Sequence, residues 1–183
     1  MGEGASTGTD RTARVLEPGF VEGLGDLSIE ELWERRDVAL LERDFQSYLR
    51  RLVQVRQDLL LAEERRRAAG EAPMGIVERI TTVLADGPRG GSRGEVLRVK
   101  LTDEDLSEAS RRAEELMGDL AGDVPLNLED ADLAEALTRL ERAERTVSAD
   151  RRGVLDVHDA VQDELKRRYR QDPTLALQRL PNS

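Results

Sequence analysis

The stretch from Ser28 to about Ala69 contains neither proline nor glycine, and this continuity limits the folds open to the chain more than any other feature of its sequence. It opens with the pattern of a capping box, in which the Ser28 hydroxyl and the Glu31 carboxylate each accept a hydrogen bond from the other residue's backbone N–H. Gly70 and Pro73 then supply the signals that end a helix. The sequence therefore predicts one helix of about 42 residues, about 63 Å long.

A second long helix is predicted toward the other end of the chain. Asn127 is a favourable N-cap, acidic residues follow it near the positive end of the helix dipole, and the helix runs to about Gln171, before Pro173. Gly153 interrupts this segment at a cost of about 1 kcal/mol relative to alanine. Either this glycine permits the close approach of a ligand or another helix, or it is tolerated by chance.

Both long segments carry apolar residues at the steps of three, four and seven that are typical of a coiled-coil seam. Because the two helices have matched lengths and a medium-length insertion joins them, we predict an all-α fold. Its two long helices form an antiparallel coiled-coil hairpin, with a shorter, mainly helical insertion, and Trp33 packs near the start of the coil. The seam residues are Leu41, Phe45, Leu52 and Leu59 in the first helix and Leu133, Leu137, Leu140, Val147, Val154, Val161 and Leu165 in the second.

These elements divide the chain into five predicted segments, of which the insertion is the most varied. Within it we expect a short amphipathic helix over 76–84, a flexible loop over 87–94, a strand over 95–101 and a helix that Thr102 caps and that runs to about Met117. The five segments are a mobile N-terminal tail over 1–26, a first coiled-coil helix over 27–70, the insertion over 71–126, a second coiled-coil helix over 127–172 and a C-terminal tail over 173–183.

Composition narrows the classes of function. Charged residues make up 36% of the chain and aromatic residues 3%, which disfavours a broad aromatic core and favours long helices. The net charge of −10 disfavours direct binding to DNA and suits docking on a basic surface. The chain has no cysteine for disulfides or zinc thiolates, no apolar run near the ~20 residues that span a bilayer, and no secretory h-region. We therefore expect a cytoplasmic protein that does not bind membranes.

A polar stripe recurs in the two long helices. In each, a serine is followed by an arginine three residues later and by an aspartate eight residues after that, and such steps keep the side chains on one side of a helix. By helical geometry the stripes lie roughly 150° and roughly 90° from the predicted seams, on an outer flank of each helix. The stripe residues are Ser47, Arg50, Gln54 and Asp58 in the first helix and Glu144, Ser148, Arg151 and Asp159 in the second.

The two stripes resemble the cyclic-di-GMP signature of the RsiG family, Glu-x3-Ser-x2-Arg-x3-Gln-x3-Asp, repeated on two helices of an antiparallel coiled coil. Proteins of this family are actinobacterial anti-sigma factors that restrain the sporulation sigma factor WhiG. The resemblance implies that the eight stripe residues bind cyclic-di-GMP, as an intercalated dimer of two molecules. It also implies that the chain sequesters a WhiG-type sigma factor in a nucleotide-dependent complex and so represses sporulation genes.

The sequence departs from the signature at two positions, Arg43 in place of the first glutamate and Leu155 in place of the second glutamine. These departures put an equal contribution of the two copies in doubt. The residue types nevertheless suit the ligand, because arginine can pair with guanine O6 and N7 or stack on the base. Aspartate can accept from the guanine N–H groups, and the serine and glutamine side chains can bond phosphate or ribose. The alternative is that the stripes are solvated faces of a ligand-free coiled-coil scaffold or assembly protein.

The sequence gives little support to an enzyme. His158 is the only histidine, so a cluster of histidines cannot hold a metal. The carboxylates recur at helical spacing, without a glycine-rich phosphate loop or a nucleophile elbow. We therefore predict neither catalytic nor metal-binding residues.

Overall fold

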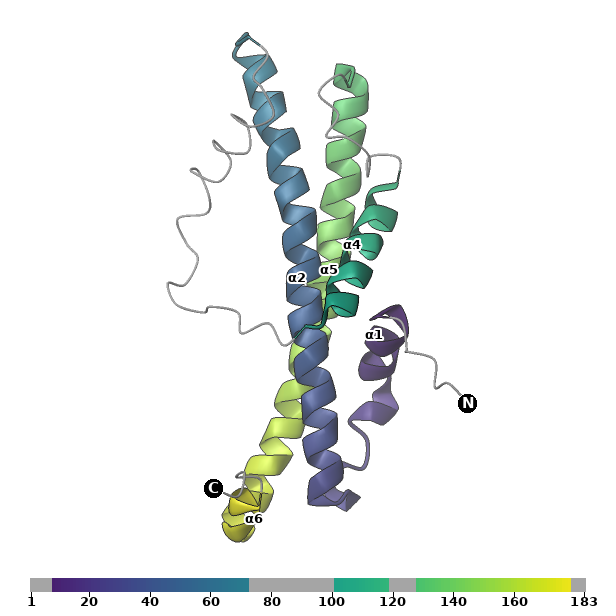
Figure 1. Cartoon of the computed structure of the whole chain (residues 1–183). Helices are drawn as coiled ribbons and strands as arrows, with labels where there is room; N and C mark the ends of the chain where they lie inside the picture. Colours follow the sequence, from purple (N-terminus) through teal and green to yellow (C-terminus); the bar gives the residue numbers. More distant parts are fainter. Residues whose placement is uncertain (1–7, 73–100, 119–127, 179–183) are drawn as a thin grey trace, which may run out of the picture. The chain divides into compact units, whose positions relative to one another are not determined.

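The computed structural model of the protein describes residues 8–72, 101–118 and 128–178, and every regular element in these ranges is helical. This confirms the predicted all-α fold with two long helices and shorter ones. The elements are α1 (Gly8–Leu16), two 3-10 helices η1 (Pro18–Phe20) and η2 (Leu24–Asp26), α2 (Ile29–Ala68), α4 (Asp103–Met117), α5 (Asp130–Gln171) and α6 (Thr174–Leu177) (Figure 1).

The chain divides into two compact units, and α2 and α5 each contribute to both. The terminal unit consists of Met1–Gln46 and Ala149–Ser183, and the central unit consists of Ser47–Ser148.

In the terminal unit, α2 and α5 run antiparallel. Leu32 near the start of α2 packs in one cluster with Leu165 near the end of α5, whereas Ala39, farther along α2, packs with Val154, farther back on α5. The Trp33 indole N–H donates to the Tyr169 hydroxyl at 2.7 Å, which confirms that this tryptophan packs near the start of the coil.

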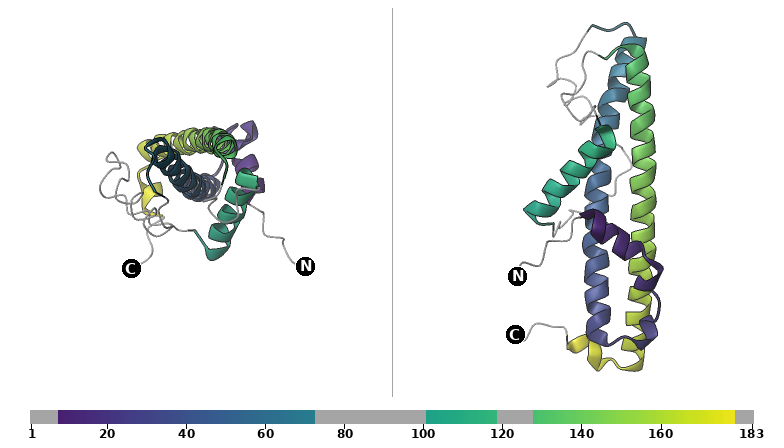
Figure 2. Two further views of the ribbon diagram at one scale, coloured as in Figure 1. Left: turned by 90° about the horizontal axis from the view of Figure 1, so that it is seen from above. Right: turned by 90° about the vertical axis from the view of Figure 1, so that its right-hand side faces the viewer.

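The central unit repeats the antiparallel arrangement with the second half of α2 and the first half of α5. Arg50 pairs with Glu144 at 2.9 Å, and Arg67, later on α2, pairs with Asp130, earlier on α5, at 2.8 Å. The short helix α4 packs against α2 and buries two of its alanines (Figure 2).

The seam of α5 agrees with its prediction, whereas the seam of α2 does not. All seven predicted apolar residues of α5 are buried. On α2, Phe45 and Leu59 are buried but Leu41 and Leu52 are only half-buried. The buried positions at seven-residue spacing lie one residue farther on, and polar residues hold three seam positions, so the apolar pattern alone gives the wrong phase. The observed α2 seam comprises Leu32, Ala39, Glu42, Gln46, Leu49, Val53, Leu60 and Glu63.

The predicted helix signals are confirmed where the structure describes them. The Ser28 backbone N–H donates to the Glu31 carboxylate at 2.7 Å, and the Glu31 backbone N–H donates to the Ser28 hydroxyl at 3.2 Å. Thr102 caps α4 through a capping box with Asp105. The predicted Asn127 cap, the helix over 76–84, the loop over 87–94 and nearly all of the strand over 95–101 lie outside the described residues.

The prediction of a mobile tail over 1–26 is wrong for its described part. Residues 8–26 form α1, η1 and η2, and Val15 of α1 is wholly buried against Ala39 and Val154. The sequence conceals this because α1 is short and polar, and tertiary contacts rather than intrinsic propensity stabilise such a helix. In the predicted C-terminal tail, α6 places Leu175 against the cluster that contains Leu32.

Candidate functional site

Four of the eight stripe residues meet in the central unit, two from each helix. Arg50 donates through Nε to Glu144 Oε1 and to Ser148 Oγ, each at 2.9 Å. The Ser148 hydroxyl donates to the same Glu144 oxygen at 2.9 Å, and the Gln54 amide reaches it at 3.5 Å. One carboxylate oxygen is therefore the common acceptor of a cluster that links both stripes.

Burial and hydrogen bonding act in opposite directions on Glu144. Partial burial raises its pKa, but the hydrogen bonds from Ser148 and Arg50, the positive charge of Arg50 and the Gln54 amide together outweigh burial. The pKa of Glu144 therefore lies below its ordinary value, and the carboxylate is ionised at neutral pH.

The cluster occupies the border of the seam because buried neighbours fix the rotation of each helix. Leu49 and Val53 flank Arg50 on α2 and are wholly buried, and Val147 precedes Ser148 on α5 and is also buried. The polar residues beside these anchors are half-buried. The cluster therefore lies outside the apolar seam but at its border, not on the outer flank that the spacing predicted.

The other four stripe residues are divided between the two units. In the central unit, Ser47 is half-buried and Asp58 is exposed. In the terminal unit, Arg151 is half-buried, and Asp159 is exposed and lies 3.2 Å from the His158 ring nitrogen Nδ1. The described contacts therefore join the first helix's Arg50 and Gln54 to the second helix's Glu144 and Ser148.

Sequence reasoning missed this crossed pairing. The signature places glutamate, serine and arginine on one helix, but here the arginine of the first copy uses the glutamate and serine of the second. Arg43, which replaces the first copy's glutamate, donates instead to its neighbour Asp44 at 2.7 Å. The antiparallel register of the observed seam is the signal that would have revealed the pairing.

Arg50 retains hydrogen-bond donors that a ligand can use. Within the described residues, its hydrogen bonds all run through Nε, and its side chain is 37% exposed. Its two terminal nitrogens can therefore serve an external pair of acceptors, such as guanine O6 and N7 or two phosphate oxygens. The bond through Nε restricts the side chain beforehand, which lowers the entropy cost of binding.

The described residues contain neither a candidate metal site nor a candidate membrane-spanning helix. No group of three or more histidine, aspartate or glutamate side chains there could hold a metal ion. Among the same residues, no helix is both long and apolar enough to cross a membrane.

One sequence model of a known family matches the part of the chain that carries the first stripe. The sequence model of the family described as RsiG-like matches residues 18–84. This confirms the resemblance inferred from the stripes and supports an RsiG-type protein. The matched segment contains all of α2, including Arg50 and Gln54, and excludes α1 and α5. No curated protein matches the chain.

Proposed function

We propose that this RsiG-like protein is an anti-sigma factor that binds cyclic-di-GMP and, with the nucleotide, holds a WhiG-type sigma factor in an inactive complex. The observation that supports this most is the cluster at Glu144, in which residues of both signature copies meet across two helices. Its Arg50 and Gln54 lie within the RsiG-like match. The family match supports the general anti-sigma role, and nucleotide binding and the identity of the sigma factor are our proposals.

The chemistry of the cluster fits a guanine nucleotide. Arg50 offers paired donors for guanine O6 and N7, and the exposed carboxylate of Asp58 can accept from guanine N1–H and N2–H₂. On the second stripe, Arg151 and Asp159 supply the same two side-chain types. A ligand with two guanines would therefore find a matching arginine and aspartate on each helix, and two intercalated molecules are the form that the resemblance implies.

Partner binding follows from thermodynamic linkage. If the nucleotide strengthens binding of the sigma factor, the sigma factor must strengthen binding of the nucleotide by the same factor. A fall in nucleotide concentration would then release the sigma factor and permit transcription of sporulation genes. This is a cytoplasmic, regulatory role rather than an enzymatic one, in keeping with the RsiG-like family.

Complex formation tests the proposal. The purified chain and a WhiG-type sigma factor are analysed by size-exclusion chromatography with light scattering, with cyclic-di-GMP, with cyclic-di-AMP and without nucleotide. We expect the chain and the sigma factor to form a one-to-one complex when cyclic-di-GMP is present, and no complex with cyclic-di-AMP or without nucleotide. Self-association of the chain, unaffected by either nucleotide or by the sigma factor, would overturn the proposal and support the scaffold alternative.

A further inference from the structure

We propose that α1 is a detachable helix that covers, within the chain itself, a docking face for a basic amphipathic helix of the protein partner. The face belongs to the terminal unit and is formed by α2 around Glu42 and by α5 around Gly153 (Figure 1). The inference rests on the proposed function only for the identity of the partner.

The polar half of this face is a buried carboxylate that depends on α1. Glu42 is wholly buried, and it accepts from Arg11 Nε at 2.7 Å and from the Thr12 hydroxyl at 2.6 Å. Its remaining bond comes from Gln46 of its own helix, at 2.8 Å. Release of α1 would remove the counterion and a second donor. A buried carboxylate without them is costly, so the uncovered face favours a replacement cation.

The apolar half of the face is shaped to admit a helix. Val15 of α1 is wholly buried against Ala39 and Val154. A methyl group at Gly153 would lie 2.8 Å from Leu16 Cδ2, closer than nonbonded carbons approach. Of the two readings of this glycine, the close approach of a helix is therefore the one that the structure supports, and the helix is α1.

Several observations indicate that α1 can detach from the face of α2 and α5, and that it satisfies this face incompletely. It has nine residues, and a helix of that length is marginal in water without tertiary contacts. It lies outside the RsiG-like match, which begins at residue 18. Gln46 Oε1 is buried and accepts no hydrogen bond within the described residues, so the face retains an acceptor that α1 leaves unsatisfied.

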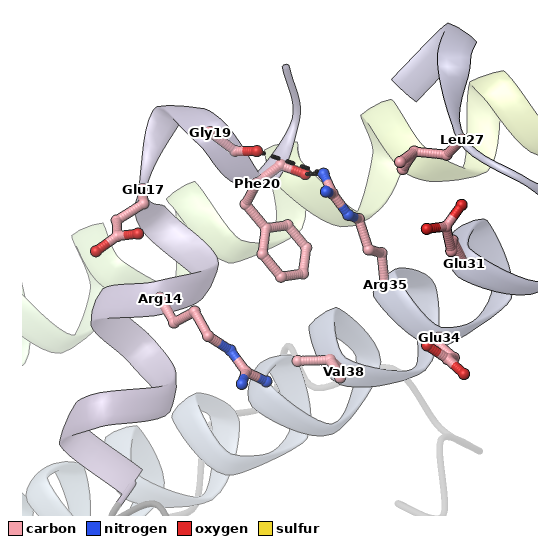
Figure 3. Close-up of a pocket in the computed structure, with 9 residues that line it drawn as sticks. All are labelled: Arg14, Glu17, Gly19, Phe20, Leu27, Glu31, Glu34, Arg35 and Val38. Atoms are coloured by element: carbon pink, nitrogen blue, oxygen red, sulfur yellow. Dashed lines mark hydrogen bonds between the residues drawn. The ribbon is translucent and has the colours of Figure 1, made fainter. Parts of the chain in front are cut away.

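A pocket beside the C-terminal end of α1 supports the same conclusion. It has a volume of about 440 Å³. Its lining residues include Arg14 of α1, Phe20 of η1 and Val38 of α2 (Figure 3). Packing between this end of α1 and α2 is thus incomplete. Its charged lining is mixed, with exposed glutamates at positions 17, 31 and 34 beside Arg14 and Arg35.

These features define the chemistry of the replacement helix. It should present an arginine or lysine to Glu42 and an apolar residue four positions later, as Arg11 and Val15 do in α1. A further donor would satisfy Gln46. The buried Glu42 carboxylate and the net charge of −10 favour a basic helix, which the WhiG-type sigma factor would supply.

A reversible lock tests the inference in the full-length chain, which contains no native cysteine. The double variant Leu16→Cys, Gly153→Cys places two thiols where the leucine side chain meets the glycine. We expect the oxidised form to bind the sigma factor, with cyclic-di-GMP present, at least about tenfold more weakly than the reduced form. The two single-cysteine variants, treated identically, should show no such difference. Equal affinity of the locked and reduced forms would overturn the docking role.

Hydrogen exchange tests the detachment of α1 without any partner. In the wild-type chain, amides of α1 should exchange at least about tenfold faster than amides of α2 in the same unit. Arg11→Ala should accelerate exchange in α1 alone, whereas Arg14→Ala, at an exposed position of the same helix, should not. Equal protection of α1 and α2 would overturn detachment. Failure of the wild-type chain to bind the sigma factor would count against the proposed function instead, because the exchange result decides the inference independently.

Discussion

Arg50 is the residue at which the two signature copies meet, because it donates hydrogen bonds to Glu144 and Ser148 of the opposite helix. We predict that Arg50→Ala weakens cyclic-di-GMP binding at least about tenfold, a loss within the ~1–3 kcal/mol expected for a bidentate contact to guanine. Helicity should be retained because the side chain is partly exposed and outside the seam. Calorimetry measures the affinity, and far-UV circular dichroism measures the helicity.

Two further variants sharpen this prediction. Arg50→Lys retains the charge but not the planar pair of donors, so it should restore little of the affinity. Arg51→Ala removes an exposed arginine one residue away and should leave the affinity unchanged. Equal affinities of the alanine variants at positions 50 and 51 would remove Arg50 from the binding site.

Glu164 provides a separate prediction about acid stability. Hydrogen bonds from Arg167 and Arg168 lower its pKa to about 2, against the opposing effect of burial. Arg168 also donates to the backbone carbonyls of Gly25 and Leu27, at 2.6 and 3.0 Å, so the pair links α5 to the segment before α2. Because the folded pKa lies below the unfolded one, the carboxylate stabilises the fold above its ordinary pKa of 4.5, and this contribution is lost as the pH falls toward about 2.

Thermal unfolding from pH 7 down to about pH 2 measures this effect, because the contribution is lost between the ordinary pKa of 4.5 and the folded pKa of about 2. Glu164→Gln should lower the Tm at pH 7 and make the Tm fall less steeply below about pH 4.5 than in the wild-type chain. Parallel Tm profiles of the two proteins would show that Glu164 makes no such contribution.

At the scale of elements, the long helices could be predicted from the sequence because their signals are local. The capping box at Ser28, the absence of breakers up to Gly70 and the apolar seam of α5 each depend on residues close together in the chain. The phase of the α2 seam could not be predicted, because Glu42 and Gln46 occupy buried positions at which they contact α1: Glu42 accepts from the Thr12 hydroxyl, and the Gln46 amide N–H donates to it. Tertiary partners, rather than the residues' own polarity, decide their burial.

The same distinction applies to the candidate site. Helical spacing was sufficient to place Arg50 and Gln54 together on α2, and Glu144 and Ser148 together on α5. It could not show which arginine meets which glutamate, since that depends on the register between the helices. The observed register pairs Arg50 with Glu144 and so relates the two signature copies across the helices.

Two valines of α2 test the observed seam directly. Val53 is wholly buried, whereas Val55, two residues later, is 42% exposed. We predict that Val53→Ala lowers the free energy of unfolding by about 2 kcal/mol, through lost burial and the cavity left behind. Val55→Ala should change it by less than about 0.5 kcal/mol. Urea unfolding measures both values, and similar losses in the two variants would contradict the assigned phase.

At the scale of the whole molecule, the two units hold different features. The central unit holds the Glu144 cluster, and the terminal unit holds Arg151, Asp159 and the face that α1 covers. A chain with a net charge of −10 gains from a basic partner in both the rate and the specificity of association.

Under the proposed function, the nucleotide and the sigma factor bind to this chain with positive coupling. Calorimetric titration of cyclic-di-GMP into the purified chain, alone and with a WhiG-type sigma factor, measures this coupling, with cyclic-di-AMP as the control. We predict binding that is specific for cyclic-di-GMP and at least about fivefold tighter when the sigma factor is present. The absence of binding in both titrations, or equal affinity for the two nucleotides, would contradict the claim.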